Sequence, residues 1–378
     1  MSTQQSATRS AMQETTVAAG PLFIVGCGCS GTTLLRLMLT SHPDLAIPYE
    51  SHFMYEVMRG RARGIWPTDL TDAVTWLHLL AFILRHPRLQ RWGFDREALF
   101  KRLQQLTERS YRDAFQAVFD EFRAQQGKTR WGDKTPQHVQ YMLVLSQLFP
   151  EAKFIHLIRD GRDVAMSLVA LELRTWGPRY MALAGYYWAW LVLSGVIGGA
   201  VLGPSRYLEV RYEDLVLAPE ATLQALCDWA GLTFTKDMLH YYATPTAQQH
   251  VQRIAPRKQR LIQPPDASRV KRWMREMAAR DQQRIVRQVG AVLSYLGYPV
   301  GKLPRRQRQT LASLERLPAL DRSAARGRTA ARADHERWVR YGLVWDRLVQ
   351  GLALVHGDVE TFAQCSLRWQ RTVATMLH

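Results

Sequence analysis

Residues 21–45 read PLFIVGCGCSGTTLLRLMLTSHPDL, and this stretch decides the fold. Its first part, Pro21 to Gly26, is a short apolar run that ends in glycine, which is typical of a buried parallel strand. From Thr33 to Leu39, apolar residues recur at helical spacing. Backbone N–H groups of the intervening glycine loop, together with the helix N-terminus, can bind a phosphate. A tight glycine turn without a ligand is the alternative interpretation.

The loop differs from that of nucleoside triphosphatases at one informative position. Those proteins place a lysine directly after the second glycine, where it reaches the β- and γ-phosphates. Thr32 occupies that position here. The loop can therefore hold a phosphate but is poorly equipped to act on a γ-phosphate, which argues against a nucleotide kinase or an ATPase.

Strands and helices continue to alternate after this unit. Such alternation indicates a parallel sheet with helices on both faces. We therefore predict an α/β fold with a P-loop-type parallel sheet flanked by helices. The strands are expected at 153–159 and 206–210, and the helices at 139–148, 160–168, 219–229 and 281–296.

The domain organisation is read from changes in composition along the chain. Residues 1–20 are polar and are expected to be disordered, and 21–300 are expected to form the catalytic domain. Within it, about 55–130 are predicted to be a helical insert. Residues 301–378 are rich in arginine, and helical spacing at 338–354 and 360–376 predicts a basic helical C-terminal extension.

Charge and cysteine content narrow the partners and the compartment. The formal net charge of +17 favours anionic partners, although part of it lies in the arginine-rich tail and could be only a solvated segment. Cys27 and Cys29 are too close to bridge comfortably, and the chain has only four cysteines. Because the first twenty residues contain no apolar segment of signal-peptide length, we expect a cytoplasmic protein.

One uncharged stretch, Met181 to Ser205, is long enough to span a bilayer. It joins two segments that must meet at one site if the fold is as predicted. A spanning helix would place them on opposite sides of a membrane. We therefore predict a buried helix and no transmembrane segment.

The segment SGTTLLRLMLTSHPDL at 30–45 resembles the sulfotransferases that use 3′-phosphoadenosine-5′-phosphosulfate (PAPS), especially their bacterial and tyrosylprotein branch. The resemblance implies that Ser30, Gly31, Thr32 and Thr33 bind the 5′-phosphosulfate end of PAPS. Cys29 belongs to the same donor-binding loop but departs from the family, which has Arg or Lys at this position. A cation expected near the sulfuryl group is therefore missing.

A second segment, IHLIRDGRDVAMSL at 155–168, resembles the element of the family that binds the 3′-phosphate. The corresponding residues here are Arg159 and Ser167. A guanidinium suits this role because it offers forked donors to a phosphate. Taken alone, the Arg-Asp pairs of this segment could equally be surface ion pairs.

Two further segments extend the resemblance to about residue 300. VRYEDLV at 210–216 places Tyr212 near the adenine, by the resemblance. The segment 268–273 (SRVKRW) is similar to the element that closes over the 3′-phosphate, which makes Arg272 and Trp273 donor-binding candidates. A helix start with a packed tryptophan ring is the alternative for this last segment.

The catalytic candidates are Glu50 and Lys134. In the branch that the chain resembles, a glutamate after the H-P-D segment is the general base, and a lysine polarises the donor. The chemistry is suitable, because an attacking hydroxyl loses a proton and the departing phosphate oxygen gains negative charge. His52 is the rival base, since imidazole titrates near neutral pH. Three other histidines, at 42, 138 and 156, are interpreted as packing or capping residues.

The resulting prediction is a PAPS-dependent sulfotransferase. It would transfer a sulfuryl group to a hydroxyl acceptor and release adenosine 3′,5′-bisphosphate. The acceptor could be a small molecule, a lipid, a peptide or a glycan, and no nucleic-acid partner is expected. No ligand-spaced His, Cys or carboxylate cluster is visible, so no metal is predicted. The alternative, motivated by Cys29, is a nucleotide-binding protein of the same fold without turnover.

Overall fold

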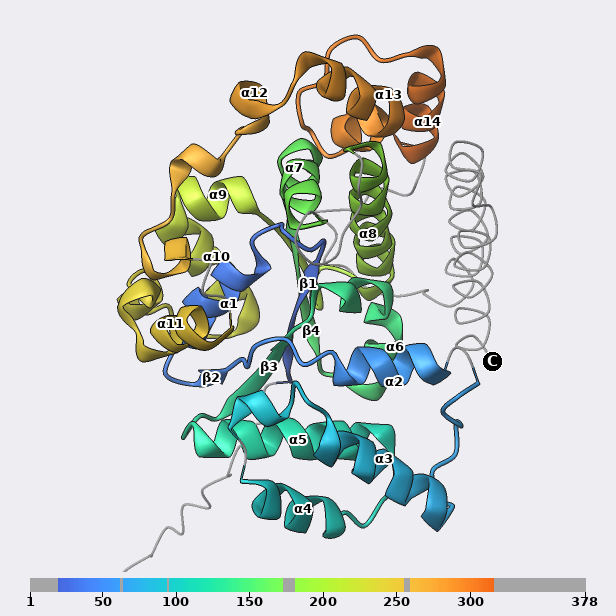
Figure 1. Ribbon diagram of the computed structural model, residues 1–378, viewed down its shortest axis with the longest axis vertical. Coiled ribbons are helices and arrows are strands. Elements are labelled where there is room, and N and C mark those ends of the chain that lie inside the picture. Colours follow the sequence, from blue (N-terminus) through green and yellow to red (C-terminus); the bar gives the residue numbers. More distant parts are fainter. Residues whose placement is uncertain (1–19, 62–63, 94, 173–180, 255–258, 316–378) are drawn as a thin grey trace, which may run out of the picture.

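Five parallel strands form the central sheet, in the order β2-β3-β1-β4-β5. The computed structural model describes residues 20–61, 64–93, 95–172, 181–254 and 259–315. A parallel sheet with helices on both faces confirms the predicted fold class (Figure 1). The strands are β1 Leu22–Gly26, β2 Leu45–Ala46, β3 Arg130–Lys134, β4 Lys153–Ile158 and β5 Tyr207–Arg211.

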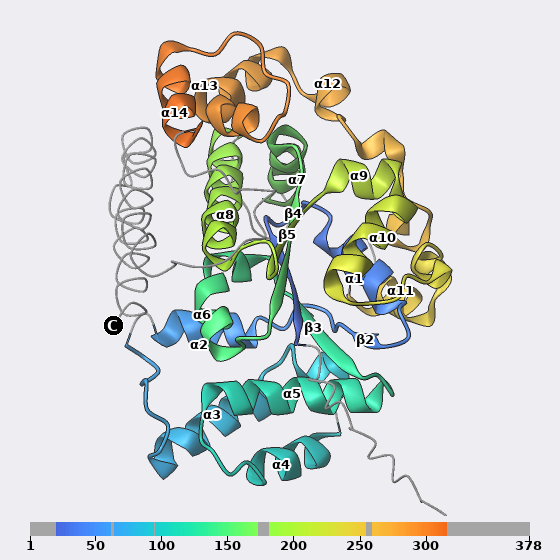
Figure 2. The same cartoon turned by 180° about the vertical axis from the view of Figure 1, so that it is seen from behind.

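The two faces of the sheet bury different helices, as Figures 1 and 2 show. Leu22 and Ile24 of β1 belong to one core cluster, and Phe23 and Val25 belong to the other, as alternation along a strand requires. The first cluster is covered by α1 Thr32–Thr40, α9 Tyr212–Leu217, α10 Pro219–Ala230 and α11 Pro245–Gln249. The second is covered by α6 Met142–Leu148, α7 Gly161–Glu172, α8 Met181–Leu202 and α13 Ala279–Tyr295.

Four helices fill the segment between β2 and β3, in agreement with the predicted helical insert. Asp72, Asp95 and Ser110 cap the last three of them by accepting backbone N–H groups, which is the usual role of these residue types. The insert packs on the sheet through aromatic rings: Phe119 stacks on Trp131 of β3 with ring centroids 4.2 Å apart. The helices are α2 Phe53–Arg61, α3 Ala73–Arg85, α4 Arg96–Gln104 and α5 Tyr111–Gln125.

β2 and β3 are not among the strands predicted from the sequence. β3 reads RWGDK, which lacks the apolar run of β1 and β4. Its charged side chains are buried because each has a partner: Arg130 donates to the carbonyls of Gly20 at 2.6 Å and Ala230 at 2.8 Å. Glycine is needed at 132, where a Cβ would approach the carbonyl oxygen of Leu22 to 2.7 Å. Tertiary contacts, not β-propensity, therefore make this segment a strand.

Helix α8 is the stretch that the sequence analysis tested as a membrane span. By length and composition, Leu183–Leu202 could cross a bilayer, but 72% of it is buried inside the structure. Its glycines explain how closely it packs: a Cβ at Gly195 would overlap the ring of His156, and one at Gly199 would overlap Tyr207. Both rings belong to the sheet and are joined by a 2.7 Å hydrogen bond. The glycines let α8 lie against β4 and β5, as expected of a buried helix.

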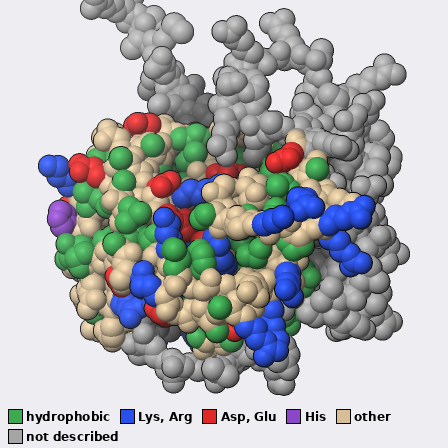
Figure 3. All heavy atoms as spheres, turned by 90° about the horizontal axis from the view of Figure 1, so that it is seen from above, with side chains coloured by type: hydrophobic (Ala, Val, Ile, Leu, Met, Phe, Trp, Pro, Cys, Tyr) green, Lys and Arg blue, Asp and Glu red, His purple; other side chains and the backbone are tan. Residues whose placement is uncertain are grey.

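The described part of the C-terminal region continues past residue 300. Helix α14 Arg305–Glu315 packs against α13, and Gln307 donates to the carbonyl of Gln288 at 2.8 Å. Figure 3 shows Lys and Arg side chains gathered at one side of the face that carries α12 Trp273–Glu276, α13 and α14. Exposed Lys302, Arg305, Arg306 and Arg308 belong to this region. Most of the expected disordered N-terminus and the expected helices at 338–354 and 360–376 lie outside the described residues.

Two glycine-to-alanine substitutions in α8 test this packing. Gly195→Ala is expected to lower the free energy of unfolding by about 1–3 kcal/mol, because the added methyl group overpacks against His156. Gly198→Ala is the matched control, since its Cβ would meet Met142 at an ordinary 3.6 Å. It should be neutral or stabilise by up to about 1 kcal/mol. Urea denaturation measures both; equal effects would contradict the close contact at Gly195.

Candidate active site

Five of the segments that carry predicted site residues lie at the carboxyl ends of the parallel strands. Lys134 is the last residue of β3, the glycine loop follows β1, and Arg159 directly follows β4. Tyr212 directly follows β5, and Glu50 comes shortly after β2. In open α/β sheets, ligands bind at this edge. The fold therefore brings five sequence-distant segments to one side of the sheet.

The glycine loop connects β1 to α1 and has the backbone conformation that its residues allow. Gly31 has φ 99°, in the left-handed region that favours glycine, and the ring of Tyr212 lies where its Cβ would be. Cys29 also has a positive φ, of 68°. The hydroxyl of Ser30 is fully buried and has no hydrogen-bond partner among the described residues. A buried hydroxyl donor in a loop before a helix N-terminus fits an anionic ligand.

Arg159 joins the loop to two other segments. Its guanidinium donates to the carbonyl of Cys29 at 3.3 Å and to the carbonyl of Arg269 at 2.7 Å. It lies 4.2 Å above the ring of Tyr212 and 3.5 Å from a carboxylate oxygen of Asp163. Its Nε is buried and makes no hydrogen bond within the described residues. Arg159 is thus a buried cation in direct contact with the loop.

Asp163 anchors the later basic segment to the same place. The backbone N–H of Trp273 donates to Asp163 Oδ1 at 2.7 Å, and the Trp273 ring lies 3.6 Å from the guanidinium of Arg162. Burial raises the pKa of Asp163, and Arg159 opposes that shift. Trp273 also begins α12, and its donor-binding role stays a prediction. Arg272 pairs with Glu276 at 3.3 Å, and its donor-binding role stays a prediction.

Ser167 lies in the second turn of α7. Its hydroxyl donates to the carbonyl of Asp163 at 3.0 Å, within its own helix. A serine bonded in this way can turn its lone pairs and proton toward another partner at small cost. Its predicted contact with a 3′-phosphate remains untested.

Glu50 and Lys134 form an ion pair at the other end of the site. Lys134 Nζ lies 3.1 Å from Glu50 Oε2, and the side-chain exposures are 2% and 33%. The buried ammonium is therefore compensated by a carboxylate that still reaches solvent. Lys134 is in register with Ile24 of β1, two residues before the strand ends at Gly26. The two predicted catalytic residues are thus adjacent and lie beside the strand that leads to the loop.

His52 lies in the same region as the Glu50–Lys134 pair. Burial lowers the pKa of His52 to about 4; Glu50 opposes this shift, while Arg88, His138 and Lys134 add to it. The imidazolium form is therefore disfavoured near neutral pH. Because a carboxyl group has an ordinary pKa in the same range, the feature that distinguishes Glu50 is its ion pair with Lys134.

The three histidines interpreted as packing or capping residues make structural contacts. His42 bridges the carbonyl of Thr233 at 2.8 Å and the backbone N–H of Asp44. His156 is fully buried against Tyr207, and burial lowers its pKa to about 3. His138 lies 2.8 Å from Asp133 in a buried pair. Asp133 lies in β3 next to Lys134, and His138 lies in the short helical turn Pro136–Gln140 after the strand, so the pair ties that turn to the strand.

The residues that hold the segments around Arg159 in place were not predicted from the sequence. Asp163 and Arg162 hold the 269–273 segment, and Asp160 pairs with Arg162 at 2.6 Å. Glu213 accepts the backbone N–H of Asp160 at 3.0 Å. The signal was present in the segment RDGRD, whose charges are too dense for a buried helix start unless they pair with one another.

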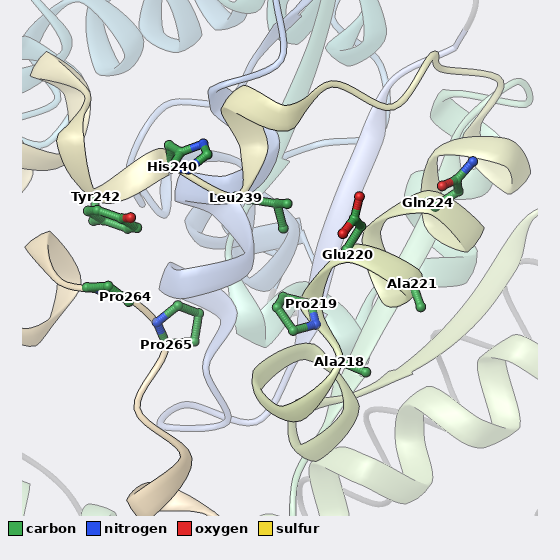
Figure 4. Close-up of a pocket in the computed structure, with 10 residues that line it drawn as sticks. All are labelled: Ala218, Pro219, Glu220, Ala221, Gln224, Leu239, His240, Tyr242, Pro264 and Pro265. Atoms are coloured by element: carbon green, nitrogen blue, oxygen red, sulfur yellow. The ribbon is translucent and has the colours of Figure 1, made fainter.

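A groove of about 740 Å³ lies elsewhere, between the start of α10 and residues 239–242 and 264–265 (Figure 4). None of the predicted site residues lines it. It carries Glu220 and His240 but no lysine or arginine, which does not suit an anionic donor. Within the described ranges, no group of three or more His, Cys, Asp or Glu could hold a metal ion.

Comparison with protein families agrees with this geometry. The model of the sulfotransferase family matches residues 21–236, which is more than half of the chain. The chain belongs to the sulfotransferase family. The matched region contains both members of the Glu50–Lys134 pair, the glycine loop, Arg159 and Tyr212.

Named relatives of this sulfotransferase act on different acceptors. Protein-tyrosine sulfotransferase 2 of Gallus gallus is 25% identical over 73% of this chain and 69% of its own length. The Drosophila melanogaster protein-tyrosine sulfotransferase is 23% identical, over 51% of its length. The omega-hydroxy-beta-dihydromenaquinone-9 sulfotransferase Stf3 of Mycobacterium bovis is 29% identical over 58% of this chain and 64% of its own length. The chain is thus an enzyme of the sulfotransferase type that spans about half to two-thirds of these relatives.

Two solved structures share the fold. The sulfotransferase domain from the Synechococcus PCC 7002 olefin synthase has a TM-score of 0.51 and 24% identity, and covers 74% of this chain and 95% of that domain. The sulfotransferase domain from the curacin biosynthetic pathway has a TM-score of 0.52 and 21% identity, with coverages of 75% and 99%. The sheet and its flanking helices are therefore those of a sulfotransferase.

The low basicity of His52 can be measured directly. In an NMR titration, with the resonance assigned through His52→Gln, the imidazole is expected to titrate near pH 4 because burial disfavours its charged form. An exposed histidine titrates near pH 6.5. A midpoint for His52 close to that value would contradict the burial of its ring.

Proposed function

We propose that PAPS is the sulfuryl donor of this sulfotransferase and that it binds along the carboxyl ends of β1, β4 and β5. The observation that carries the proposal is the pair of buried donors beside one loop. Ser30 Oγ and Arg159 Nε each lack a hydrogen-bond partner in the described part of the chain. Two such donors, one of them cationic, fit a ligand that is anionic at both of its ends.

The residues divide between the two ends of the donor. The loop from Cys29 to Thr33, followed by the N-terminus of α1, would hold the 5′-phosphosulfate. Arg159 would hold the 3′-phosphate together with Ser167 and Arg272. Ser167 is bonded to Asp163, and Arg272 directly precedes Trp273, which Asp163 also binds. The rings of Tyr212 and Trp273 would border the nucleoside. Bound PAPS supplies an activated sulfuryl group.

Glu50 and Lys134 supply the proton chemistry in this proposal. Glu50 takes the acceptor proton as the acceptor oxygen bonds to sulfur and the bond from sulfur to the phosphate oxygen breaks. Lys134 compensates the charge that develops on the departing oxygen. The products are a sulfate ester and adenosine 3′,5′-bisphosphate. The 3.1 Å ion pair supports these roles because it keeps the base and the cation together.

Cys29 changes the electrostatics of the proposed sulfuryl site. The loop carries no cation at this position, so Lys134 and Arg159 are the buried cations that flank it. The backbone carbonyl of Cys29 accepts a hydrogen bond from Arg159, which brings that cation to the loop by another route. We propose that this contact compensates in part for the missing side-chain charge.

The proposed acceptor is a hydroxyl-bearing molecule. The relatives' names include a protein tyrosine and a hydroxylated menaquinone, so a phenol and an alcohol are both within the chemistry of the family. Glu50 can serve either one, since each loses one proton to the carboxylate. The first helix of the insert, α2, begins at Phe53, shortly after Glu50, so we propose that the insert contributes to the acceptor side.

Calorimetric titration tests the donor assignment. Adenosine 3′,5′-bisphosphate should bind at least about tenfold more tightly than adenosine 5′-monophosphate, because Arg159 makes charged hydrogen bonds only to the 3′-phosphate. Arg159→Ala should remove this difference, whereas Arg305→Ala, a matched change at an exposed arginine, should preserve it. Equal affinities for the two nucleotides in the unchanged protein would refute the assignment.

Steady-state kinetics with PAPS and a phenolic acceptor test the base. Glu50→Gln is expected to lower kcat by about 10²- to 10⁴-fold, the usual contribution of a general base. His52→Gln should lower it by less than about tenfold, because the proposal places the base at Glu50, which is paired with Lys134. Binding of adenosine 3′,5′-bisphosphate serves as the folding control for both. The reverse order of effects would assign the base to His52.

A further inference from the structure

A second, enclosed cavity of about 190 Å³ lies behind the segment that joins β2 to α2. It is separate from the proposed donor site, because neither the glycine loop nor Arg159 nor Tyr212 lines it. It does include Tyr49, the neighbour of Glu50. Its walls come from α1, residues 46–49, residues 91–93, the end of α5, Lys128 and the segment 246–250.

Arg36 of α1 is the central feature of this cavity. Its side chain is only 1% exposed, although it carries a positive charge. One terminal nitrogen donates to the carbonyl of Ile47 at 3.1 Å, while Nε and the other terminal nitrogen have no hydrogen-bond partner in the described part of the chain. Leaving buried charged donors without acceptors costs several kcal/mol in proteins. The free edge of the guanidinium is thus a site with unmet hydrogen-bonding capacity.

Two further cations belong to this cavity. Arg91 and Lys128 are among its lining residues, which include no Asp or Glu, and the carboxylate that acts on Arg36 is Glu50, outside the lining. Lys128 donates to the carbonyls of Thr40, His42 and Leu45 at 2.5, 3.0 and 3.0 Å, so its ammonium contributes charge without a donor to spare. The field inside the cavity therefore attracts an anion, and Arg36 supplies the directional contact.

The remaining walls are aromatic and rigid. Tyr49, Trp92 and Phe122 line the cavity, and the indole N–H of Trp92 donates to the carbonyl of Tyr49 at 2.8 Å. Thr40 donates to the carbonyl of Ile47 at 3.2 Å, which fixes the same segment from the other side. A fixed apolar wall around a buried guanidinium suits a small anionic group better than it suits a hydrated cation.

We propose that this cavity binds a compact oxyanion, a sulfate or a carboxylate, through the free edge of the Arg36 guanidinium. Nε and the adjacent terminal nitrogen form a fork that matches two oxygens of such a group. The anion can be a free ion or an anionic group carried by a larger molecule. Tyr49 lines the cavity and is the residue before Glu50 in the chain. An anion bound in the cavity would therefore lie close to the proposed base.

Calorimetry on the full chain with sodium sulfate and sodium benzoate, against sodium chloride at constant ionic strength, tests the proposal. At least one oxyanion should bind at least about tenfold more tightly than chloride, as two charged hydrogen bonds imply. Sulfate alone would identify a free tetrahedral ion as the ligand. Preference for benzoate would identify a carboxylate on an aromatic body, which the walls of the cavity can accommodate.

Variants locate the site and keep it distinct from the proposed donor site. Gln249→Glu puts a carboxylate at the rim and should weaken oxyanion binding at least about fivefold by repulsion. Gln105→Glu, the same change at an exposed residue outside the cavity, should have no effect. Arg36→Met should abolish binding, and Gln249→Glu decides the matter if that variant does not fold. Arg159→Ala should leave binding intact.

Two results would overturn the proposal. The first is an affinity for sulfate and benzoate no greater than for chloride. The second is binding that Arg159→Ala removes and Gln249→Glu preserves, because the anion would then occupy the proposed donor site. Neither result depends on whether PAPS is the donor, since no nucleotide is used.

Discussion

The stacking of Arg159 on Tyr212 is the contact on which the site depends. The guanidinium lies between the ring of Tyr212 and the carboxylate of Asp163, and it donates to the carbonyls of Cys29 and Arg269. Cys29 follows β1, Asp163 follows β4, Tyr212 follows β5, and Arg269 precedes α12. One side chain therefore holds four segments together at the carboxyl edge of the sheet. Tyr212 in turn contacts Gly31, which leaves no room for a larger residue in the loop.

A site assembled in this way carries a large buried charge. Arg159, Lys134 and Arg162 are each nearly inaccessible to solvent, and each is matched by a carboxylate: Asp163, Glu50 or Asp160. Burying charge is costly unless it is paired, so the acids are as necessary to the fold as the cations. The pairing is incomplete at Arg159 and Ser30, where buried donors remain. An anionic ligand at these donors would complete the network, which is how the fold and the proposed donor site are linked.

The elements that could be predicted from the sequence are those whose structure depends on residues close together in the chain. β1, the loop, α1, β4 and the start of α7 were predicted because their apolar runs and glycines act within a few residues. β3 was missed because Arg130 and Lys134 are buried only through partners distant in sequence, such as Ala230 and Glu50. The function of the chain could be predicted because short contiguous segments of the sequence carry the resemblance to the sulfotransferases.

The residues behind the site were harder to predict for the same reason. Arg36 is buried although it is charged, because the carbonyl of Ile47, distant by 11 residues in the chain, accepts its hydrogen bond. The support that Asp163 gives to Trp273 spans 110 residues and leaves no local pattern. The individual residues Glu50, Lys134 and Arg159 were predicted by type and position, and the structure adds their mutual contacts. Their catalytic and binding roles remain predictions.

The central claim is that the donor lies along the edge from the glycine loop to Arg159, with Glu50 and Lys134 at its reactive end. A crystal structure of the protein with adenosine 3′,5′-bisphosphate tests it most directly. The account predicts the 5′-phosphate at the N–H groups of Ser30 to Thr33 and the 3′-phosphate on Arg159, which would have released the carbonyl of Arg269 or Cys29 to bind it. A bisphosphate bound elsewhere, with Arg159 still held by both carbonyls and Ser30 uncontacted, would contradict it.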